Sequence, residues 1–301
     1  MPDIIRIKSI TQLHQLLGFE KPTHPLISII DVSKWEIGKE WVGVKATCDL
    51  YMIALKDASC GMEYGRNSYD FGEGVLIFTA PDQVMLTNKE QKVGEKRGWM
   101  LFFHPDLIRN TVLGQNIDNY HFFSYDVYEA LHLSESEQNL MTECVTFIEQ
   151  EIKQRIDNHS QRVVVSLLEL VLNYCTRFYE RQFNTRSAQN KDVIAQFETL
   201  IRSYYTAGKF SEVGIPTIEY FAGHIHLSPG YLSDLLKKET GYTAKDLINN
   251  FIVEKAKTLL LKEKESVSII AYQLGFNYPH YFARLFKAKT GMSPQEYRKI
   301  N

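Results

Sequence analysis

Residues 279–287 carry side chains that suit contact with a nucleic acid. His280, Ala283, Arg284 and Lys287 fall three and four residues apart, so in a helix they share one side, and Pro279 precedes them. We expect His280 to contact a base, Lys287 to contact phosphate, and Arg284 to pair with a guanine or clamp a phosphate. The other side of this helix is apolar and would be buried, with Phe282, Leu285 and Phe286.

The segment 269–298 around these residues has the spacing of a helix-turn-helix. Ala271 and Gly275 stand four residues apart. A small alanine lets two helices cross closely, and a glycine can adopt the left-handed turn between them. The second helix of such a unit is the one that enters a DNA major groove.

The same pattern occurs once more upstream, where residues 221–243 align with residues 270–293. Ala222 matches Ala271 at an offset of 49, whereas Gly241 matches Gly291 at an offset of 50, so the second turn carries one extra residue. A repeat of this length indicates two related supersecondary units. Between them, one face of a predicted linker helix is apolar, with Leu247, Ile248, Phe251, Ile252, Ala256, Leu259 and Leu260. We expect this helix, about 15 residues long, to hold the two units about one turn of B-DNA apart.

The upstream unit has a well-marked second helix. Ser228 is a good N-cap, and Pro229 suits the first helical position. Asp234 can accept from a cytosine amino group, but an acid near phosphates is more often a mild penalty, so this helix is predicted to be the weaker reader. Its DNA-facing residues are predicted to be Gly230, Ser233, Asp234, Lys237 and Lys238, with Lys289 of the second unit as a further phosphate contact.

This arrangement resembles the DNA-binding domain of the AraC/XylS family of bacterial transcription regulators. The resemblance covers about the last hundred residues, and Ile252 and Leu236 depart from it, standing where the family usually has Arg and Phe. It implies a DNA-binding regulator, by family habit an activator, with an N-terminal sensor domain, and RNA polymerase as a partner. The second unit carries it through Ala271, Leu274, Gly275, Phe276, Tyr281, Phe282, Arg284, Phe286, Lys287, Gly291, Ser293, Pro294, Tyr297 and Arg298, and the first through Ala222, Leu227, Ser228, Tyr231, Leu232, Lys237, Gly241 and Ala256.

Length and charge fit two domains. The chain has 301 residues and a net charge of −2, but residues 190–301 hold 15 Lys and Arg against 11 Asp and Glu, while residues 1–189 hold 19 against 25. A basic domain beside an acidic one fits a nucleic-acid surface joined to a regulatory module, although +4 alone is modest.

The segment 24–103 is predicted to be β-rich, and the family resemblance implies that it is a cupin-like β-barrel. Its short β-branched and aromatic runs are broken by Gly, Asp and Asn, which is typical of a sandwich or small barrel. Barrel mouths often hold small molecules. Aromatic residues that would pack the core or line an effector pocket are Trp35, Tyr51, Phe78, Trp99 and Phe102.

We expect no metal, cofactor or catalytic residue. Metal-binding cupins use an HxH pair, but this segment holds only His24 and His104, and the chain's one such pair, His224 and His226, falls on the first helix-turn-helix turn. The four cysteines have no CxxC spacing, no apolar leader opens the chain, and the longest apolar run, 163–175, is too short to span a membrane. These features predict a cytoplasmic protein.

Residues 105–183 are predicted to be helical. Ser134 and Glu137 form a capping box opening a helix that buries Leu140, Cys144, Phe147, Ile148, Ile152 and Ile156. In the next helix we expect Val163, Leu167, Leu170, Val171, Tyr174 and Phe178 to pack on the barrel and the previous helix. A second apolar face of this helix consists of Val164, Leu168, Leu172 and Cys175. It needs a partner, which is either a second subunit in a homodimer formed through 135–183 or the rest of the domain.

The predicted organisation is therefore α+β and multidomain. Residues 1–183 form a ligand-sensing and dimerisation domain, polar residues 184–192 a linker, and residues 193–301 an all-α DNA-binding domain. The leading hypothesis is a transcription regulator that responds to a small-molecule effector. The alternatives are a cupin-type metalloenzyme fused to a DNA-binding tail, and a constitutive DNA-binding protein whose first domain only dimerises.

Overall fold

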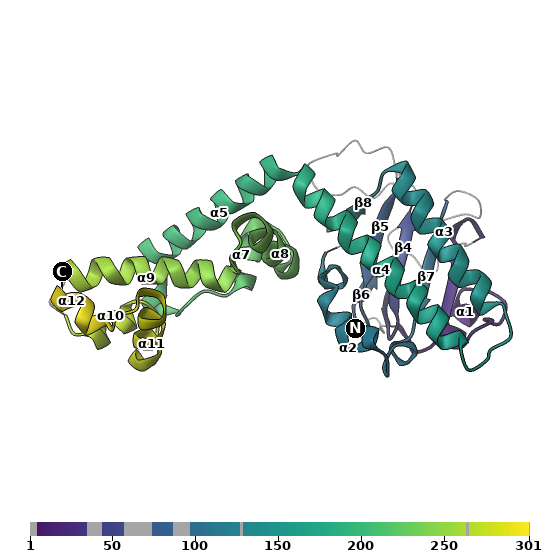
Figure 1. The fold of residues 1–301 in the computed structure, drawn as a ribbon, viewed down its shortest axis with the longest axis horizontal. Helices are drawn as coiled ribbons and strands as arrows, with labels where there is room; N and C mark the ends of the chain where they lie inside the picture. Colours follow the sequence, from purple (N-terminus) through teal and green to yellow (C-terminus); the bar gives the residue numbers. More distant parts are fainter. Residues whose placement is uncertain are drawn as a thin grey trace. The chain divides into compact units, whose positions relative to one another are not determined.

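The structure is a computed structural model that describes residues 5–34, 44–56, 74–86, 97–126, 129–262 and 265–300. The chain divides into an N-terminal unit, Met1–Asn184, and a C-terminal unit, Thr185–Asn301 (Figure 1). Each unit has a hydrophobic core of its own. Trp35 and Cys60 lie outside the described residues.

Two sheets make up the β part of the N-terminal unit. The larger has the order β2-β7-β4-β5-β8, and every neighbouring pair in it is antiparallel. The smaller has the order β1-β3-β6, with β1 and β3 parallel. The strands are β1 (Ile5–Ile7), β2 (Ile27–Asp31), β3 (Lys45–Cys48), β4 (Tyr51–Lys56), β5 (Val75–Thr79), β6 (Val84–Leu86), β7 (Gly98–Phe103) and β8 (Leu131–His132).

Side-chain alternation along β7 gives the larger sheet two buried faces. Met100 and Phe102 join one core with helix α1 (Ile10–Leu16) and strands of the smaller sheet. Trp99, Leu101 and Phe103 point to the opposite face, because successive residues of a strand alternate. That second face is packed with aromatic rings from Phe78, Phe122, Phe123 and Tyr179.

The predicted cupin-like barrel is not confirmed. The segment 24–103 contains the strands β2 to β7, as predicted, but in the described part of the chain the strands form two separate sheets, and neither closes on itself. The result is a mixed helix and sheet unit.

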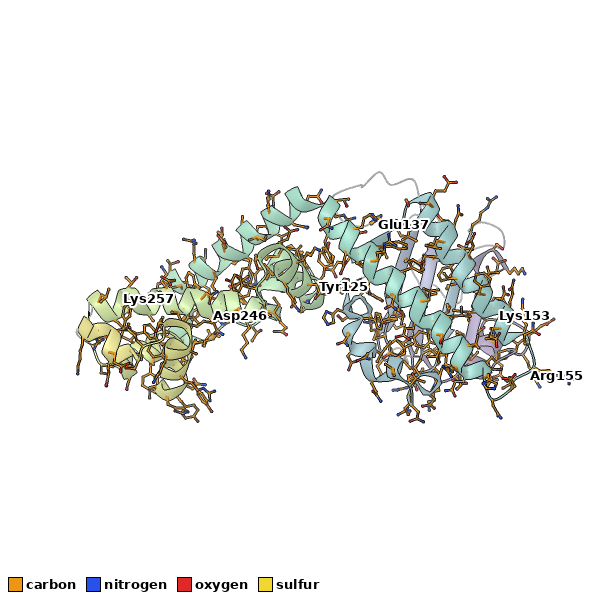
Figure 2. The ribbon with its side chains drawn as sticks, in the orientation of Figure 1. Tyr125, Glu137, Lys153, Arg155, Asp246 and Lys257 are labelled. Carbon is orange, nitrogen blue, oxygen red and sulfur yellow. The ribbon has the colours of Figure 1, made fainter. Side chains whose placement is uncertain are left out.

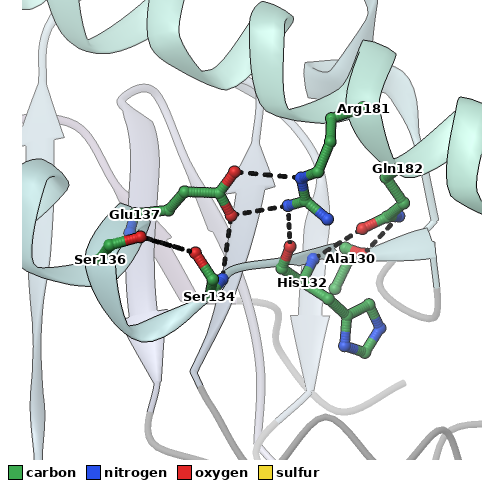
Figure 3. A network of polar contacts seen from close by, with 7 residues as sticks. All are labelled: Ala130, His132, Ser134, Ser136, Glu137, Arg181 and Gln182. Carbon is green, nitrogen blue, oxygen red and sulfur yellow. Dashed lines mark hydrogen bonds and ion pairs between the residues drawn. The ribbon is translucent and has the colours of Figure 1, made fainter.

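Two long helices, α3 (Glu135–Ile152) and α4 (Ser160–Thr185), cover the aromatic face after the short helix α2 (Val112–Asn116). The predicted capping box is confirmed: the Ser134 hydroxyl accepts from the Glu137 N–H, and the Glu137 carboxylate accepts from the Ser134 N–H. Arg181 of α4 donates to both Glu137 oxygens and, at 2.6 Å, to the His132 carbonyl (Figure 3). Gln182 also bonds the backbone of β8, so one polar network joins β8, α3 and α4.

The predicted faces of α3 and α4 need correction. On α3, Phe147 is 55% exposed and Met141 and Val145 are buried instead. Ile156 lies beyond the end of α3, so it cannot follow that helix face, and it is exposed.

On α4 the prediction is confirmed in part. Val171 and Phe178 are buried as predicted, and the second face is buried within the domain, which is one of the two alternatives given above. Val164, Leu168, Leu172 and Cys175 are buried within the N-terminal unit, whereas Val163 and Leu170 are exposed. The face with Val164 and Cys175 is buried because its next turn carries Tyr179. The Tyr179 ring stacks on Phe122 and packs on Phe78 of the sheet.

The C-terminal unit is all-helical and has one core. Residues 184–192, predicted to be the linker, form the end of α4 and the start of α5, and Asn190 is buried, donating to Glu239. The helices are α5 (Ser187–Thr206), α6 (Lys209–Glu212), α7 (Ile218–Ile225), α8 (Pro229–Thr240), α9 (Ala244–Lys262), α10 (Val267–Gln273), α11 (Pro279–Thr290) and α12 (Pro294–Ile300).

Three described cysteines, Cys48, Cys144 and Cys175, are buried free thiols. Burial raises the pKa of all three, that of Cys48 to about 11, so they remain protonated near neutral pH. In the described residues, no helix is both long enough and apolar enough to cross a membrane.

Candidate nucleic-acid interface

Two helix-turn-helix units lie in the C-terminal unit, α7–α8 and α10–α11, and their turns share one hydrogen-bond pattern. The Leu227 N–H donates to the Ala222 carbonyl at 3.0 Å, and the Phe276 N–H donates to the Ala271 carbonyl at 3.0 Å. Both alanines are fully buried, as expected where two helices cross closely. The repeat seen in the sequence is therefore a repeat of backbone geometry.

The residue that forms each turn has left-handed backbone. Gly275 has φ +86°, as predicted, and His226 takes the same place in the first unit with φ +60°. A Cβ at position 275 would lie 2.8 Å from the Phe210 carbonyl oxygen, so that turn also needs glycine for close packing. His226 is exposed to solvent, which explains why a non-glycine residue is tolerated there.

The two recognition helices end alike. Gly241 and Gly291 are left-handed C-caps with φ of +76° and +80°. Their N–H groups donate to the backbone carbonyl oxygens of Lys237 and Lys287, respectively. Gly241 and Gly291 are 50 positions apart, whereas the turn residues His226 and Gly275 are 49 apart. This difference confirms the extra residue in the second turn.

The helices begin differently. The Ser228 hydroxyl accepts from the Tyr231 N–H at the start of α8, confirming the predicted N-cap. Tyr278 takes that place before α11 and makes no side-chain capping bond. The positive end of α11 is thus less satisfied by its own chain, and helix N-termini of this kind bind phosphate.

The outer face of α11 matches the predicted reading face. His280, Arg284 and Lys287 are exposed, while Pro279 and Ala283 are half-buried between them and the core. Phe282 and Phe286 on the opposite side are fully buried. The amphipathic division of this helix therefore presents one imidazole and two cations to solvent.

Tyrosines extend this face, and the sequence-based list of site residues missed them. The His280 ring lies 4.2 Å from the Tyr281 ring, and Tyr278 lies 6.0 Å from Tyr281, measured between centroids. Tyr281 also lies 5.4 Å from the Arg284 guanidinium, in cation–π range. The signal was available as the spacing of Tyr278, Tyr281 and Arg284, three residues apart.

The face of α8 is less accessible. Lys237 and Lys238 are exposed in its last turn, but Gly230, Ser233 and Asp234 are half-buried. Helix α8 therefore presents cations at one end and partly covered side chains along its middle. This arrangement suits phosphate contact better than base reading.

Helix α9 joins the units and has 19 residues, so it spans about 28 Å rather than the 22 Å expected for about 15 residues. Ile252 is fully buried in its core face, where the family usually has Arg. Asp246 forms an ion pair with Lys289, and Lys257 forms one with Glu254; Asp246 and Lys257 are labelled in Figure 2. Lys289, predicted to contact phosphate, is instead held 3.2 Å from Asp246, and this pair ties α11 to α9.

The predicted effector-pocket residues do not converge. Tyr51, Phe78 and Trp99 lie on the helix-covered face of the larger sheet, and Phe102 lies on the face toward the smaller sheet. Phe78 packs against Phe122 at 4.4 Å between centroids. The Trp99 indole donates to the Thr142 hydroxyl. These four side chains pack the cores of the unit rather than one shared cavity.

The histidines considered as metal ligands have other contacts. His24 is buried, which lowers its pKa, and its Nδ1 accepts from the Leu26 N–H. His104 Nδ1 accepts from the Asp106 N–H, and His224 Nδ1 bonds the Tyr220 carbonyl. The described residues contain no group of three or more His, Cys, Asp or Glu that could hold a metal ion.

Comparison with known proteins identifies the region of the two helix-turn-helix units as a DNA-binding domain. A family model described as a helix-turn-helix domain matches residues 221–300. The chain is 30% identical over 149 residues to the HTH-type transcriptional regulator YfiF of Bacillus subtilis, covering 49% of this chain and 44% of YfiF. The C-terminal unit carries an AraC-type helix-turn-helix domain.

Two further proteins are similar to this chain. The transcriptional regulator YijO of Escherichia coli is 33% identical over 143 residues, covering 48% of this chain and 47% of YijO. The C-terminal domain of the response regulator yesN from Fusobacterium nucleatum is 32% identical and covers 36% of this chain and 98% of its own, with a TM-score of 0.32. The chain spans about half the length of the curated relatives it matches.

The α11 face makes a specific prediction about base reading. His280→Ala should reduce the preference for the selected sequence over competitor DNA by about 1–3 kcal/mol, because a direct base contact is lost. Lys287→Ala should weaken binding to all sequences alike, since a phosphate contact reads no base. Fluorescence anisotropy of both variants on selected and scrambled duplexes measures the difference. Equal, sequence-blind losses would show that His280 is not a reader.

Proposed function

We propose that this protein is a sequence-specific DNA-binding transcription regulator. The observation that carries the proposal is the AraC-type domain with an exposed His280, Arg284 and Lys287 on one face of α11. The relatives that it matches over about half their length are named transcriptional regulators, which favours the same class of function.

In this proposal the two recognition helices have unequal roles. α11 reads bases through His280. Arg284 is held over the Tyr281 ring, so that its guanidinium is pre-oriented toward the DNA major groove. α8 contributes Lys237 and Lys238 to the phosphate backbone, which sets affinity and register.

The N-terminal unit would serve as the regulatory module. We propose that it is a cupin-like sensor for a small-molecule effector and that the protein activates transcription through RNA polymerase. Two facing sheets with their own core support this role. A thermal-shift screen of sugars, fatty acids and aromatic metabolites against the full chain tests it: a compound that raises the melting temperature supports a sensor, and a uniformly flat screen counts against it.

DNA binding itself is tested by its dependence on salt. Lys and Arg that neutralise phosphates release counterions, so the logarithm of the binding constant should fall with the logarithm of salt concentration, by about −0.9 per phosphate contacted. Anisotropy titrations of the full chain with duplex DNA at several salt concentrations give the slope. A flat salt dependence would refute the proposed DNA-binding function.

We also propose a homodimer formed through the α3 and α4 helices. An apolar stripe runs along α4 outside the core, made of Val163, Leu167, Leu170 and Tyr174 at i, i+4, i+7 and i+11, with Leu170 42% exposed. Because helices with such a stripe bury it against a partner, the stripe supports self-association.

Substitution on this stripe should separate the subunits. Leu170→Glu places a charge in the proposed interface and should weaken the dimer by about 2 kcal/mol or more. Thr176→Glu is the control, since Thr176 is exposed on α4 outside the stripe. Sedimentation velocity should show Leu170→Glu dissociating at concentrations where the control stays dimeric. A monomeric parent chain, or equal behaviour of both variants, would refute this interface.

A further inference from the structure

A groove of about 730 Å³ lies within the C-terminal unit, between its two helix-turn-helix units. Its walls come from the segment before α7 and the first turn of α7, from the start of α9 and from one side of α11. Ser233 of α8 completes the lining. The groove therefore touches both recognition helices and the helix that joins them.

Its lining is mostly apolar. Ile218, Ile248, Phe276 and Leu285 line it, together with Ala288 on the exposed side of α11. Small-molecule sites are concave, largely apolar and about 300–1,000 Å³ in volume, and this groove fits that description. A sugar–phosphate backbone is charged and well hydrated, so DNA alone does not match such a lining.

The charged groups in the groove favour an anion. Lys245 and Arg284 both line it, and among the described residues neither has a carboxylate within ion-pair distance. The one acid in the lining, Glu219, already accepts from the Thr217 hydroxyl and from its own backbone N–H, contacts that lower its pKa. The positive end of α9, which begins at Ala244, adds to the same field.

We propose that this groove binds a small organic anion with an apolar body, its charged group held by Lys245 and Arg284 and its body packed on Ile218, Phe276 and Leu285. Such a ligand occupies the AraC-type domain itself, separately from any effector in the N-terminal unit. Binding would oppose DNA binding, because Arg284 is also on the proposed reading face of α11. This last consequence, and only this one, rests on the proposed function.

The probe for the site is 8-anilinonaphthalene-1-sulfonate, which combines an apolar ring system with a single sulfonate. Titration of the full chain, without DNA, should give a saturable rise in dye fluorescence. Ala288→Trp places an indole over the groove and should weaken dye binding by about tenfold or more, and Lys245→Gln by about fivefold through loss of a charge-assisted contact. Both positions are exposed, so neither substitution removes core packing.

Two matched variants place the dye. Ala195→Trp adds the same indole to an exposed position of α5, and Lys257→Gln removes a lysine from α9, both outside the groove. These should bind the dye as the parent chain does. The proposal is overturned if no saturable binding occurs, or if all four variants bind alike, which would place the dye elsewhere, for example on the exposed stripe of α4. If Ala288→Trp does not fold by circular dichroism, the comparison of Lys245→Gln with Lys257→Gln decides alone.

The link to DNA is measured separately. Saturating dye should lower the affinity of the parent chain for duplex DNA by about tenfold, and the affinity of Ala288→Trp by much less. A dye that binds in the groove but leaves DNA affinity unchanged would overturn the competition while leaving the site standing. Absence of DNA binding by the parent chain would instead refute the proposed function, so the two failures are distinguishable.

Discussion

The arrangement of the DNA-binding half depends on one close backbone contact. The Gly275 turn of the second helix-turn-helix packs against α6 and the chain between α6 and α7. A Cβ at 275 would meet the Phe210 carbonyl of α6 and the backbone of Gly214 and Ile215 beyond it. That chain leads directly into α7, the first helix of the first unit. Glycine at one position therefore fixes the two units to each other as well as shaping one turn.

Helix α9 and its contacts complete this coupling. Its core face, from Ala244 through Ile252 to Leu260, joins the common core of both units, and the Asp246–Lys289 pair holds α11 against it. The Thr243 hydroxyl and the Lys289 ammonium lower the pKa of the Asp246 carboxyl, so it remains ionised. A single core under two recognition helices gives them a fixed spacing, which a protein that contacts two successive major-groove segments requires.

Local signals in the sequence predicted the local structure well. The Ser134–Glu137 capping box, the Ser228 cap and the left-handed Gly275 each depend on neighbouring residues, and each is confirmed. The prediction was wrong where the answer depends on distant partners. Helix α4 is apolar around more than half its circumference, so only contacts such as that of Tyr179 with the sheet decide which face is buried. Of the aromatic residues predicted to pack the core or line a pocket, the strand register places Phe102 on the opposite face from Tyr51, Phe78 and Trp99.

We propose that one protomer contacts DNA through both helix-turn-helix units. Ile252, the half-buried α8 face and Asp234 are the features that would argue for a single reading unit. Hydroxyl-radical footprinting of the full chain on a duplex selected from random sequence tests this two-unit contact. With the units joined by α9, each protomer should protect two segments on one face of the duplex, about one helical turn apart. Protection of only one major-groove segment per protomer would rule out contact through both units and leave the first unit as a structural support for α11.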